Sequence, residues 1–291
     1  MTGLPDSYAS PRHLPFNSTC LDDQFLFESA DRDPGGIGCW LLLRGTELLL
    51  PETGGALTLP VGASPALPGL SAPLYFGRWQ QMSCRTASLA KDAPLPIGWV
   101  AHNLMAPDPL LPIDLLSLGA LARQLLQWQE NSCHCSRCGS EQQTMPGEWG
   151  RRCNGCGALH FPHIHPCVIV IVRRPGELLL TRKAEWPPGR YSLVAGFLDL
   201  GECLEEAVER EVREETGVEI TNIRYVGSQS WPFPSQLMAG FVADYVSGEV
   251  CVEEKELEDA RWFSIDALPQ LPPKRSIARY LIDHHALADL S

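Results

Sequence analysis

The segment from Gly196 to Val218 constrains the fold of this chain more than any other part of its sequence. It is dense in glutamate, and between the charges its apolar residues recur at three- and four-residue steps. This spacing is typical of an amphipathic helix with one buried stripe. The sequence therefore predicts a helix over about 203–216, with its buried face formed by Leu204, Ala207, Val208 and Val212.

Two acidic residues of this helix lie where apolar residues are expected. On a helical wheel Glu211 and Glu215 fall in the middle of the apolar stripe, one turn apart, whereas Arg210 and Arg213 fall on the far side. A solvated helix face, the ordinary interpretation of a charge run, does not explain buried carboxylates, which need compensating cations. With the arginines expected to point elsewhere, we predict a divalent metal site, and oxygen ligands favour Mg²⁺ or Mn²⁺.

A second motif is a doubled cysteine pair before this helix. Two Cys-x-x-Cys pairs are separated by fourteen residues. Each pair can direct two thiolates at one ion, and two pairs complete a tetrahedral zinc site. A redox pair is the alternative, but the doubled spacing in a turn-rich segment argues against it. Four thiolates leave no open position, so we predict one structural zinc ion per chain, bound by Cys135, Cys138, Cys153 and Cys156.

Composition excludes several other classes of protein. Lys and Arg total 23 and Asp and Glu total 35, giving a net charge of −12, which argues against a nucleic-acid binder that relies on a basic surface. Eleven cysteines without a secretion signal argue against a disulfide framework. No apolar run approaches the ~20 residues of a membrane span. We therefore expect a cytoplasmic protein with no membrane partner, and the sequence shows no internal repeat.

The pattern along the chain predicts three domains. Residues 1–128 form an N-terminal β-rich domain with a closing helix over about 113–130, and its first residues, about 1–35, form a loose arm or an irregular start. Residues 129–161 form the zinc ribbon, and residues 162–291 form the last domain. There the sequence predicts a hairpin (167–173 and 177–182), strands near 192–195, 223–229, 237–246, 249–253 and 260–264, and a helix from about 275. Mixed strands with few helices predict an α/β (α+β) sandwich.

The glutamate-rich segment resembles the Nudix box, G-x5-E-x7-R-E-U-x-E-E-x-G-U with U aliphatic. The fixed positions are all present, as Gly196, Glu202, Arg210, Glu211, Val212, Glu214, Glu215, Gly217 and Val218. Nudix enzymes use Mg²⁺ or Mn²⁺ to cut the pyrophosphate bond of nucleoside diphosphates linked to another group. The resemblance implies a Nudix α/β/α sandwich in which Glu211 and Glu215 bind metal and Glu214 binds metal or orients the attacking water. It also implies structural roles for Gly196 and Gly217 and a brace between Glu202 and Arg210.

A second resemblance follows the box. A Trp and a Phe held between prolines suit stacking against a base or nicotinamide ring, although a Pro-kinked edge strand with core aromatics is the alternative. Residues 228–236 are similar to the S-Q-P-W-P-F-P-x-S array of NADH pyrophosphatases, the Nudix branch that also removes NAD caps from RNA and carries a four-Cys ribbon. Six of the eight fixed positions match, with Ser230 in place of Pro and Gln236 in place of the last Ser. The resemblance implies substrate binding by Gln229, Ser230, Trp231, Pro232, Phe233, Pro234, Ser235 and Gln236.

The same family resemblance implies further site residues and a partner. Glu256 and the backbone carbonyl of Ala195 would bind metal, and Phe197 would stack on one ring of the dinucleotide. Phe161 would reach into the site of a partner subunit, because the family is typically a homodimer. Glu148 and Ala278 match weaker substrate contacts.

These features together predict an enzyme that hydrolyses NADH or NAD⁺ to a nicotinamide mononucleotide and AMP. With NAD-capped RNA the product would be a 5′-monophosphate RNA. Two alternatives stay open at this point. The chain could prefer ADP-ribose or another dinucleotide, or it could be a non-catalytic Nudix module that binds nucleotides or RNA.

Overall fold

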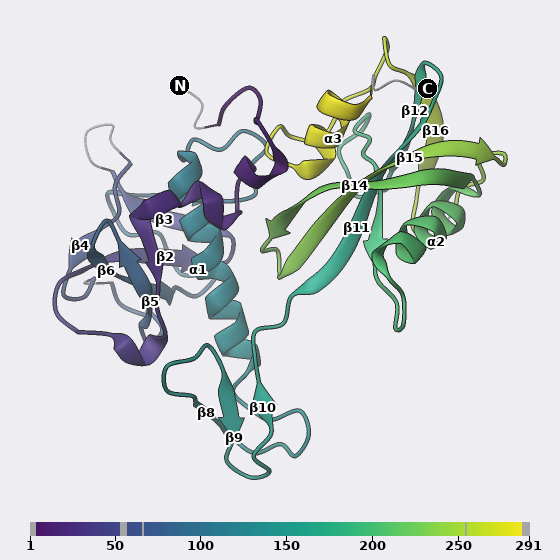
Figure 1. Ribbon diagram of the computed structural model, residues 1–291. Helices are drawn as coiled ribbons and strands as arrows, with labels where there is room; N and C mark the ends of the chain where they lie inside the picture. The colour runs from purple at the N-terminus through teal and green to yellow at the C-terminus, as the bar shows by residue number, and fades with distance from the viewer. Residues whose placement is uncertain (1–3, 53–56, 66, 254, 287–291) are drawn as a thin grey trace. The chain divides into compact units, whose positions relative to one another are not determined.

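The computed structural model describes residues 4–52, 57–65, 67–253 and 255–286 of the chain. These residues form two compact units (Figure 1). One unit contains residues 18–163, together with the turn Pro232–Ser235. The other contains Pro5–Asn17, Ile164–Trp231 and the residues from Gln236 onward. The predicted glutamate-rich helix belongs to the second unit, and the predicted zinc ribbon belongs to the first.

The second unit is built on a six-stranded sheet in which the order is β14-β15-β11-β12-β16 and β13 pairs with β11. The central pair β11–β15 is parallel, and the other pairs are antiparallel. The predicted hairpin is present as β11 and β12. The bounds are His165–Arg174 for β11, Glu177–Arg182 for β12, Val194–Phe197 for β13, Glu219–Trp231 for β14, Gln236–Ser247 for β15 and Asp259–Ser264 for β16.

Helices α2 (Leu204–Thr216) and α3 (Ile277–His285) cover opposite faces of this sheet. Val170 and Val172 of β11 share a buried cluster with Val208 of α2. Arg173 follows Val172 on the strand and points to the other face, because successive strand residues alternate. There its guanidinium donates to the carbonyl of His285 in α3, at 3.2 Å. The predicted α/β/α sandwich is confirmed.

The N-terminal part of the first unit is a seven-stranded sheet closed by helix α1 (Ile113–Asn131), as predicted. Its order is β1-β5-β6-β2-β3-β7, with β4 paired to β2. The strands are Phe25–Phe27 (β1), Gly38–Arg44 (β2), Glu47–Pro51 (β3), Val61–Gly62 (β4), Leu74–Trp79 (β5), Met82–Ser88 (β6) and Trp99–Asn103 (β7). No helix in the described part of the chain is long and apolar enough to cross a membrane.

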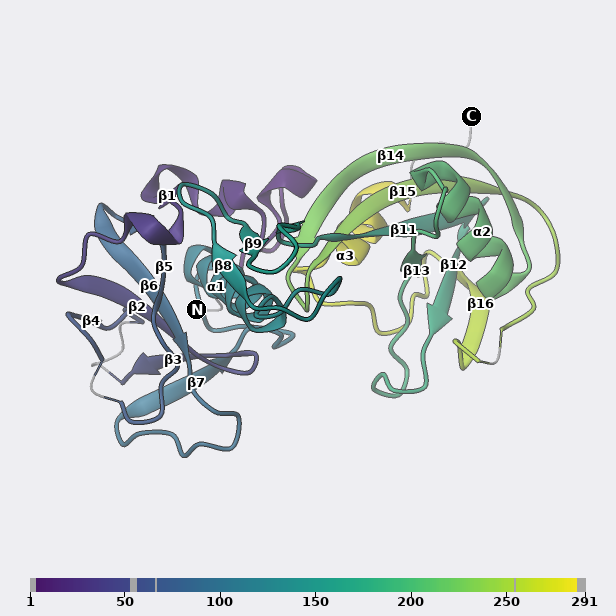
Figure 2. The same cartoon turned by 90° about the horizontal axis from the view of Figure 1, so that it is seen from below.

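The two large sheets share one topology, which the sequence did not reveal. The order β5-β6-β2-β3-β7 repeats β14-β15-β11-β12-β16, and in both sheets the central pair is parallel (Figures 1 and 2). The expectation of no internal repeat is therefore wrong at the level of topology. The first sheet has no counterpart of α2, since the described residues between β4 and β5 contain no helix. It therefore lacks the helix that carries the acidic residues.

A small antiparallel sheet forms the ribbon between these two sheets in the sequence. Its order is β10-β9-β8, with β8 at Gln142–Thr144, β9 at Arg151–Cys153 and β10 at Leu159–His160.

Of the two expectations for the first 35 residues, the irregular start agrees with residues 4–35, which the structure describes, and the loose arm is wrong for them. They form four short 3-10 turns and β1, and they bury Tyr8, Leu14, Phe16 and Leu21. These apolar residues follow no helical or strand period, so the sequence pattern gave no signal of an ordered segment.

Candidate active site

Helix α2 is fixed at both ends by its own sequence. At its start the Glu206 carboxylate accepts a hydrogen bond from the backbone N–H of Cys203, at 2.8 Å. At its end Gly217 adopts φ 74° and donates its N–H to the carbonyl of Arg213, at 2.9 Å. A left-handed residue of this kind is the usual end of a helix and favours glycine. Between these ends the apolar stripe of α2 packs on the sheet, and Glu211 and Glu215 lie on the same buried side.

Arg210 ties the glycine-rich loop before α2 to the helix. Its guanidinium donates to both carboxylate oxygens of Glu202, at 2.5 and 2.9 Å, and to the carbonyl of Phe197, at 2.8 Å. Glu202 also accepts the backbone N–H of Asp199, at 2.8 Å. The hydrogen bonds from Arg210 lower the pKa of Glu202 to about 2. The structure therefore brings together the pair that the resemblance implied, and together they hold the loop against the helix.

The expectation that the arginines point away from the inward glutamates is wrong for Arg210. It also donates to Glu211, at 2.9 Å, and to Glu214, at 3.0 Å. Its long side chain crosses the helix surface, which a helical wheel cannot show because the wheel places only the Cα–Cβ direction. Glu211 therefore has a cationic partner. Burial nevertheless raises the pKa of Glu211, and the bonds from Arg210 oppose this shift.

Glu215, unlike Glu211, accepts no hydrogen bond from an arginine among the described residues. It is 2% exposed, and neither carboxylate oxygen has a hydrogen-bond partner among the residues that the structure describes. Burial raises its pKa to about 8; the charge of Lys183 opposes the shift, and the charges of Glu211 and Glu256 add to it. A buried carboxylate without donors is stable as an anion only beside a cation. This orphaned acid group therefore fits a divalent metal ion.

Strand β13 brings the backbone close to these acids. At Gly196 a Cβ atom would overlap the carboxylate of Glu211, so any larger residue would force that carboxylate to move. Ala195, the predicted carbonyl ligand, precedes it on the same strand and pairs with Ile169 of β11. The glycine that opens the Nudix box thus leaves room for the Glu211 carboxylate.

Glu256 follows a segment, residues 249–253, that the sequence predicted as a strand. Residues 249–253 are not a strand: Cys251 donates its N–H to the carbonyl of Thr216, at 2.9 Å, and Glu253 donates to the carbonyl of Glu215, at 3.2 Å. The segment therefore satisfies the open carbonyls at the end of α2 instead of joining the sheet. Glu256 follows in this loop, and its charge raises the pKa of Glu211 and Glu215, as expected for nearby carboxylates.

Trp231 ends β14, and a turn over Pro232–Ser235 joins it to Gln236 of β15. The Trp231 ring is half-buried. The ring of Phe16 meets it edge to face at 5.5 Å, and the guanidinium of Arg275 lies 5.5 Å from its centre. Phe233 and Pro234 lie within the turn itself, and Ser235 is its last residue. The predicted ring-stacking residue is therefore held by contacts that the sequence did not predict.

Gln229 does not lie where a substrate could touch its side chain. It is fully buried, and its amide donates to the carbonyls of Pro15 and Arg275, at 2.9 and 2.8 Å. Its side-chain oxygen accepts the N–H of Ile277, at 2.8 Å. The side chain therefore has a structural role, and the substrate contact that the resemblance implies for Gln229 stays a prediction. Ala278, the neighbour of Ile277 on α3, is also buried, at 5% exposure, which leaves its methyl group no surface for substrate.

Phe197 and Phe161 differ from these residues in being open to solvent. Phe197 is 52% exposed at the end of β13, and Phe161 is 46% exposed after β10. An exposed aromatic ring can stack on a ligand or a second protein surface. Both residues are therefore accessible for the contacts that the resemblance implied.

Glu148 is positioned by residues that sequence reasoning missed. The preceding Gly147 donates its N–H to the carboxylate of Asp31, at 3.0 Å. The ring of Trp149, which follows, stacks on Phe27 at 5.2 Å, and its indole N–H donates to the carbonyl of Glu28, at 3.1 Å. In the sequence, the apolar run Phe25–Phe27 is the feature that could have indicated these contacts. In the structure this run and Glu28 hold the loop around Glu148 through Trp149.

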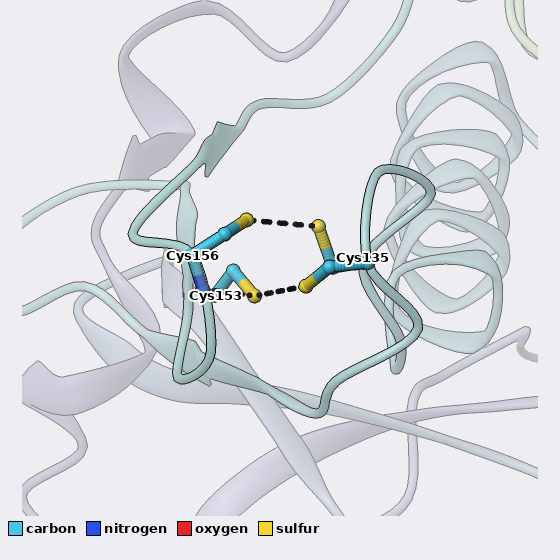
Figure 3. Close-up of side chains that lie close together, drawn as sticks. Cys135, Cys153 and Cys156 are labelled. Carbon is cyan, nitrogen blue, oxygen red and sulfur yellow. Dashed lines mark hydrogen bonds between the residues drawn. The ribbon is translucent and has the colours of Figure 1, made fainter.

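The four ribbon cysteines converge as the spacing predicts (Figure 3). Their sulfur atoms all lie within 4.8 Å of one another, and Cys138 and Cys153 approach to 3.3 Å. The Sγ of Cys153 also accepts the backbone N–H groups of Gly155 and Cys156, at 3.3 and 3.4 Å, which stabilises a thiolate. Tetrahedral zinc–thiolate geometry places sulfurs about 3.8 Å apart. The cluster is a structural zinc site.

Family models match most of this architecture, from residue 38 to residue 285. A NUDIX domain matches residues 163–285, an NADH pyrophosphatase zinc ribbon domain matches residues 130–161, and an NADH pyrophosphatase-like rudimentary NUDIX domain matches residues 38–128. The last description agrees with the N-terminal sheet, which repeats the topology of the catalytic sheet and lacks α2.

Curated relatives match over most of their length. The chain is 38% identical to the NAD-capped RNA hydrolase NudC of Pseudomonas aeruginosa, over 89% of this chain and 93% of that protein. It is 48% identical to the NudC of Pseudomonas fluorescens, over 86% and 89%, and 39% identical to that of Chromobacterium violaceum, over 84% and 90%. With the zinc ribbon and the Nudix glutamates in place, this chain belongs to the NADH pyrophosphatase and NudC family of Nudix hydrolases.

Proposed function

We propose that this protein hydrolyses the pyrophosphate bond of NADH and NAD⁺, giving a nicotinamide mononucleotide and AMP. On NAD-capped RNA the same cut leaves a 5′-monophosphate end. The observation that carries the proposal is the buried carboxylate of Glu215, which has no hydrogen-bond partner among the described residues and lies on the same helix face as Glu211. The relatives named NAD-capped RNA hydrolase support this choice of substrate.

The acidic residues have distinct parts in this reaction. Glu211, Glu215, Glu256 and the Ala195 carbonyl would hold Mg²⁺ or Mn²⁺, and the bound ion would supply positive charge to the diphosphate and lower the pKa of a water molecule. Glu214 is exposed and bound to Arg210, so its carboxylate is available to orient the attacking water. Arg210 holds Glu211 and Glu214 in place relative to the end of β13, where Phe197 lies.

The protein offers two aromatic side chains, one exposed and one half-buried, on which the rings of the substrate can stack. Phe197 presents its ring to solvent at the end of β13, and Trp231 is held in place at the end of β14. Stacking on aromatic rings contributes about 1–3 kcal/mol per base. We assign these two residues to the rings of the dinucleotide.

A non-catalytic module fits the site less well. A carboxylate that is 2% exposed and lacks donors lowers the stability of the fold, and a protein that only binds nucleotides has no need of it. A preference for ADP-ribose is the nearer rival, because it would need the same acids and only one of the aromatic contacts.

Comparing substrates tests the proposal directly. With Mn²⁺ present and equal concentrations of NADH and ADP-ribose, we expect kcat/KM for NADH to be higher by ~10-fold or more, since one lost ring contact is worth ~1–3 kcal/mol. The products AMP and reduced nicotinamide mononucleotide are separated by chromatography. Faster cleavage of ADP-ribose would overturn the assignment to NADH, and cleavage of neither would favour the binding module. NAD-capped RNA is then tested for conversion to 5′-monophosphate RNA.

We also propose that the protein acts as a homodimer. Phe161 is 46% exposed on the first unit, as expected of a residue that contacts a partner subunit. Light scattering after size exclusion should give about twice the chain mass of 32.1 kDa. A mass equal to one chain, at concentrations at which the enzyme is active, would contradict the proposal.

A further inference from the structure

The N-terminal segment Pro5–Asn17 belongs to the same compact unit as the catalytic sheet, although more than two hundred residues separate Asn17 from its contacts there. It lies along β14, which is the outer strand of that sheet. An outer strand presents unpaired backbone groups that other segments can bind. The segment therefore covers the edge of the strand that ends in Trp231.

The Asn17 side chain bonds backbone groups of β14 that a neighbouring strand would otherwise pair with. Its side-chain oxygen accepts the N–H of Ser230, at 2.8 Å, and its side-chain amide donates to the carbonyl of Ser228, at 3.3 Å. The amide also donates to the carbonyl of Pro11, at 2.9 Å, which anchors it to its own segment. Both ends of the carboxamide are therefore used to hold the backbone just before Trp231.

Phe16 supports the Trp231 ring itself. It is 7% exposed and meets that ring edge to face, with centres 5.5 Å apart and planes at 83°. Its backbone has φ 77°, a conformation that bulky residues rarely adopt. A strained residue persists only where surrounding contacts hold it, and here the strain aims the ring at Trp231.

Two further contacts fix the segment against the strand. Pro11 packs so closely on Gly227 that a Cβ atom there would lie 2.7 Å from the proline ring. The carbonyl of Pro15 accepts a hydrogen bond from the Gln229 side chain, whose amide also donates to the carbonyl of Arg275 and whose oxygen accepts the N–H of Ile277, the first residue of α3. Residues 227–231 are therefore held by the N-terminal segment on one side and by the α3 region on the other.

We infer that Asn17 and Phe16 are positioning residues for the substrate: they hold Trp231 in the orientation in which it receives a ring of the dinucleotide. The inference rests on the proposed function, because it assigns Trp231 to substrate. Neither residue touches the acids that carry out hydrolysis. Their loss should therefore weaken substrate binding and leave the chemical step almost unchanged.

A double-mutant cycle on the full chain tests this inference. Asn17→Ala is expected to raise KM for NADH ~10-fold and to change kcat less than about twofold, since it removes two hydrogen bonds that hold the backbone at Ser228 and Ser230, just before Trp231. Trp231→Ala alone should also raise KM. In the Trp231→Ala background Asn17→Ala should have almost no further effect, because the ring that it positions is gone. Phe16→Leu, which keeps an apolar side chain, should raise KM in the same way as Asn17→Ala.

The controls separate positioning from folding and from the choice of substrate. Asn131→Ala replaces an exposed asparagine at the end of α1 and should leave both constants unchanged. The inference would be overturned if KM for NADH were unchanged in both Asn17→Ala and Phe16→Leu. It would also be overturned if Asn17→Ala raised KM by the same factor in the wild type and in the Trp231→Ala background. Failure of the wild-type chain to cleave NADH would instead overturn the proposed function, so the two failures are distinguishable.

Discussion

Replacing Glu215 with glutamine is expected to lower the rate of NADH hydrolysis on the order of 10²-fold or more, while making the protein more stable in the absence of Mg²⁺ and Mn²⁺. Glutamine has the same shape but no charge. It therefore removes a metal-binding anion from the active site and also removes an uncompensated buried charge from the fold. A residue kept only for packing would not give opposite effects on activity and stability.

The stability effect should depend on pH. Burial raises the pKa of Glu215 from 4.5 to about 8, so the folded state holds this proton more tightly than the unfolded state does. The resulting stabilisation is complete below pH 4.5 and is lost as the pH rises through 8. In buffer free of Mg²⁺ and Mn²⁺, the melting temperature of the wild type should therefore fall over this range. That of Glu215→Gln should fall less.

Thermal unfolding with and without Mn²⁺ measures the predicted effect of Glu215→Gln on stability. Added Mn²⁺ should raise the melting temperature of the wild type and have little effect on Glu215→Gln. Glu209→Gln is the matched control, because it makes the same change on an exposed position of α2 and should behave as the wild type. Normal turnover, or a full response to Mn²⁺ in Glu215→Gln, would remove Glu215 from the metal site.

The sequence was sufficient for the parts of the fold that follow a regular period or spacing. The apolar stripe of α2 predicted which glutamates turn inward, and two Cys-x-x-Cys pairs predicted the cluster of sulfurs. Both depend on contacts within one short segment. The hairpin β11–β12 was predictable for the same reason, since its turn lies between two apolar runs.

The parts that the sequence did not reveal depend on side chains that meet across the fold. Arg210 folds back to Glu211, and Gln229 turns its amide toward Pro15 and Arg275. The segment 249–253 has the composition of a strand, but its N–H groups bind the end of α2. Each is an outcome of tertiary contacts that override a local preference.

The shared topology of the two large sheets was hidden for a different reason. A sheet order is set by which strands bury their apolar faces together, and many sequences satisfy the same order. The N-terminal sheet keeps the order and lacks the helix with the glutamates, so no motif marked the repeat. Function in this chain therefore resides in α2 and its neighbours, and the repeated sheet alone does not supply it.

Loss of zinc from the ribbon should have the largest effect on folding. Cys153→Ser is expected to reduce bound zinc from about one ion per chain to almost none, because the Cys153 sulfur is buried within the cluster and serine is a poor zinc ligand. Structural zinc contributes an apparent ~10–16 kcal/mol in small zinc-binding peptides, which is comparable to the whole stability of a typical domain, about 5–15 kcal/mol. The ribbon should therefore unfold without the ion.

Two measurements and one matched variant decide this prediction. Metal analysis gives the zinc content, and the fluorescence of Trp149, which is packed against Phe27 and Trp128, should shift to the red as the ribbon opens. Cys133→Ser makes the same change at an exposed cysteine whose thiol bonds only a helix carbonyl, so it should keep both the zinc and the fluorescence. Retention of zinc by Cys153→Ser, or its loss from Cys133→Ser, would mean that a different set of sulfurs binds the ion.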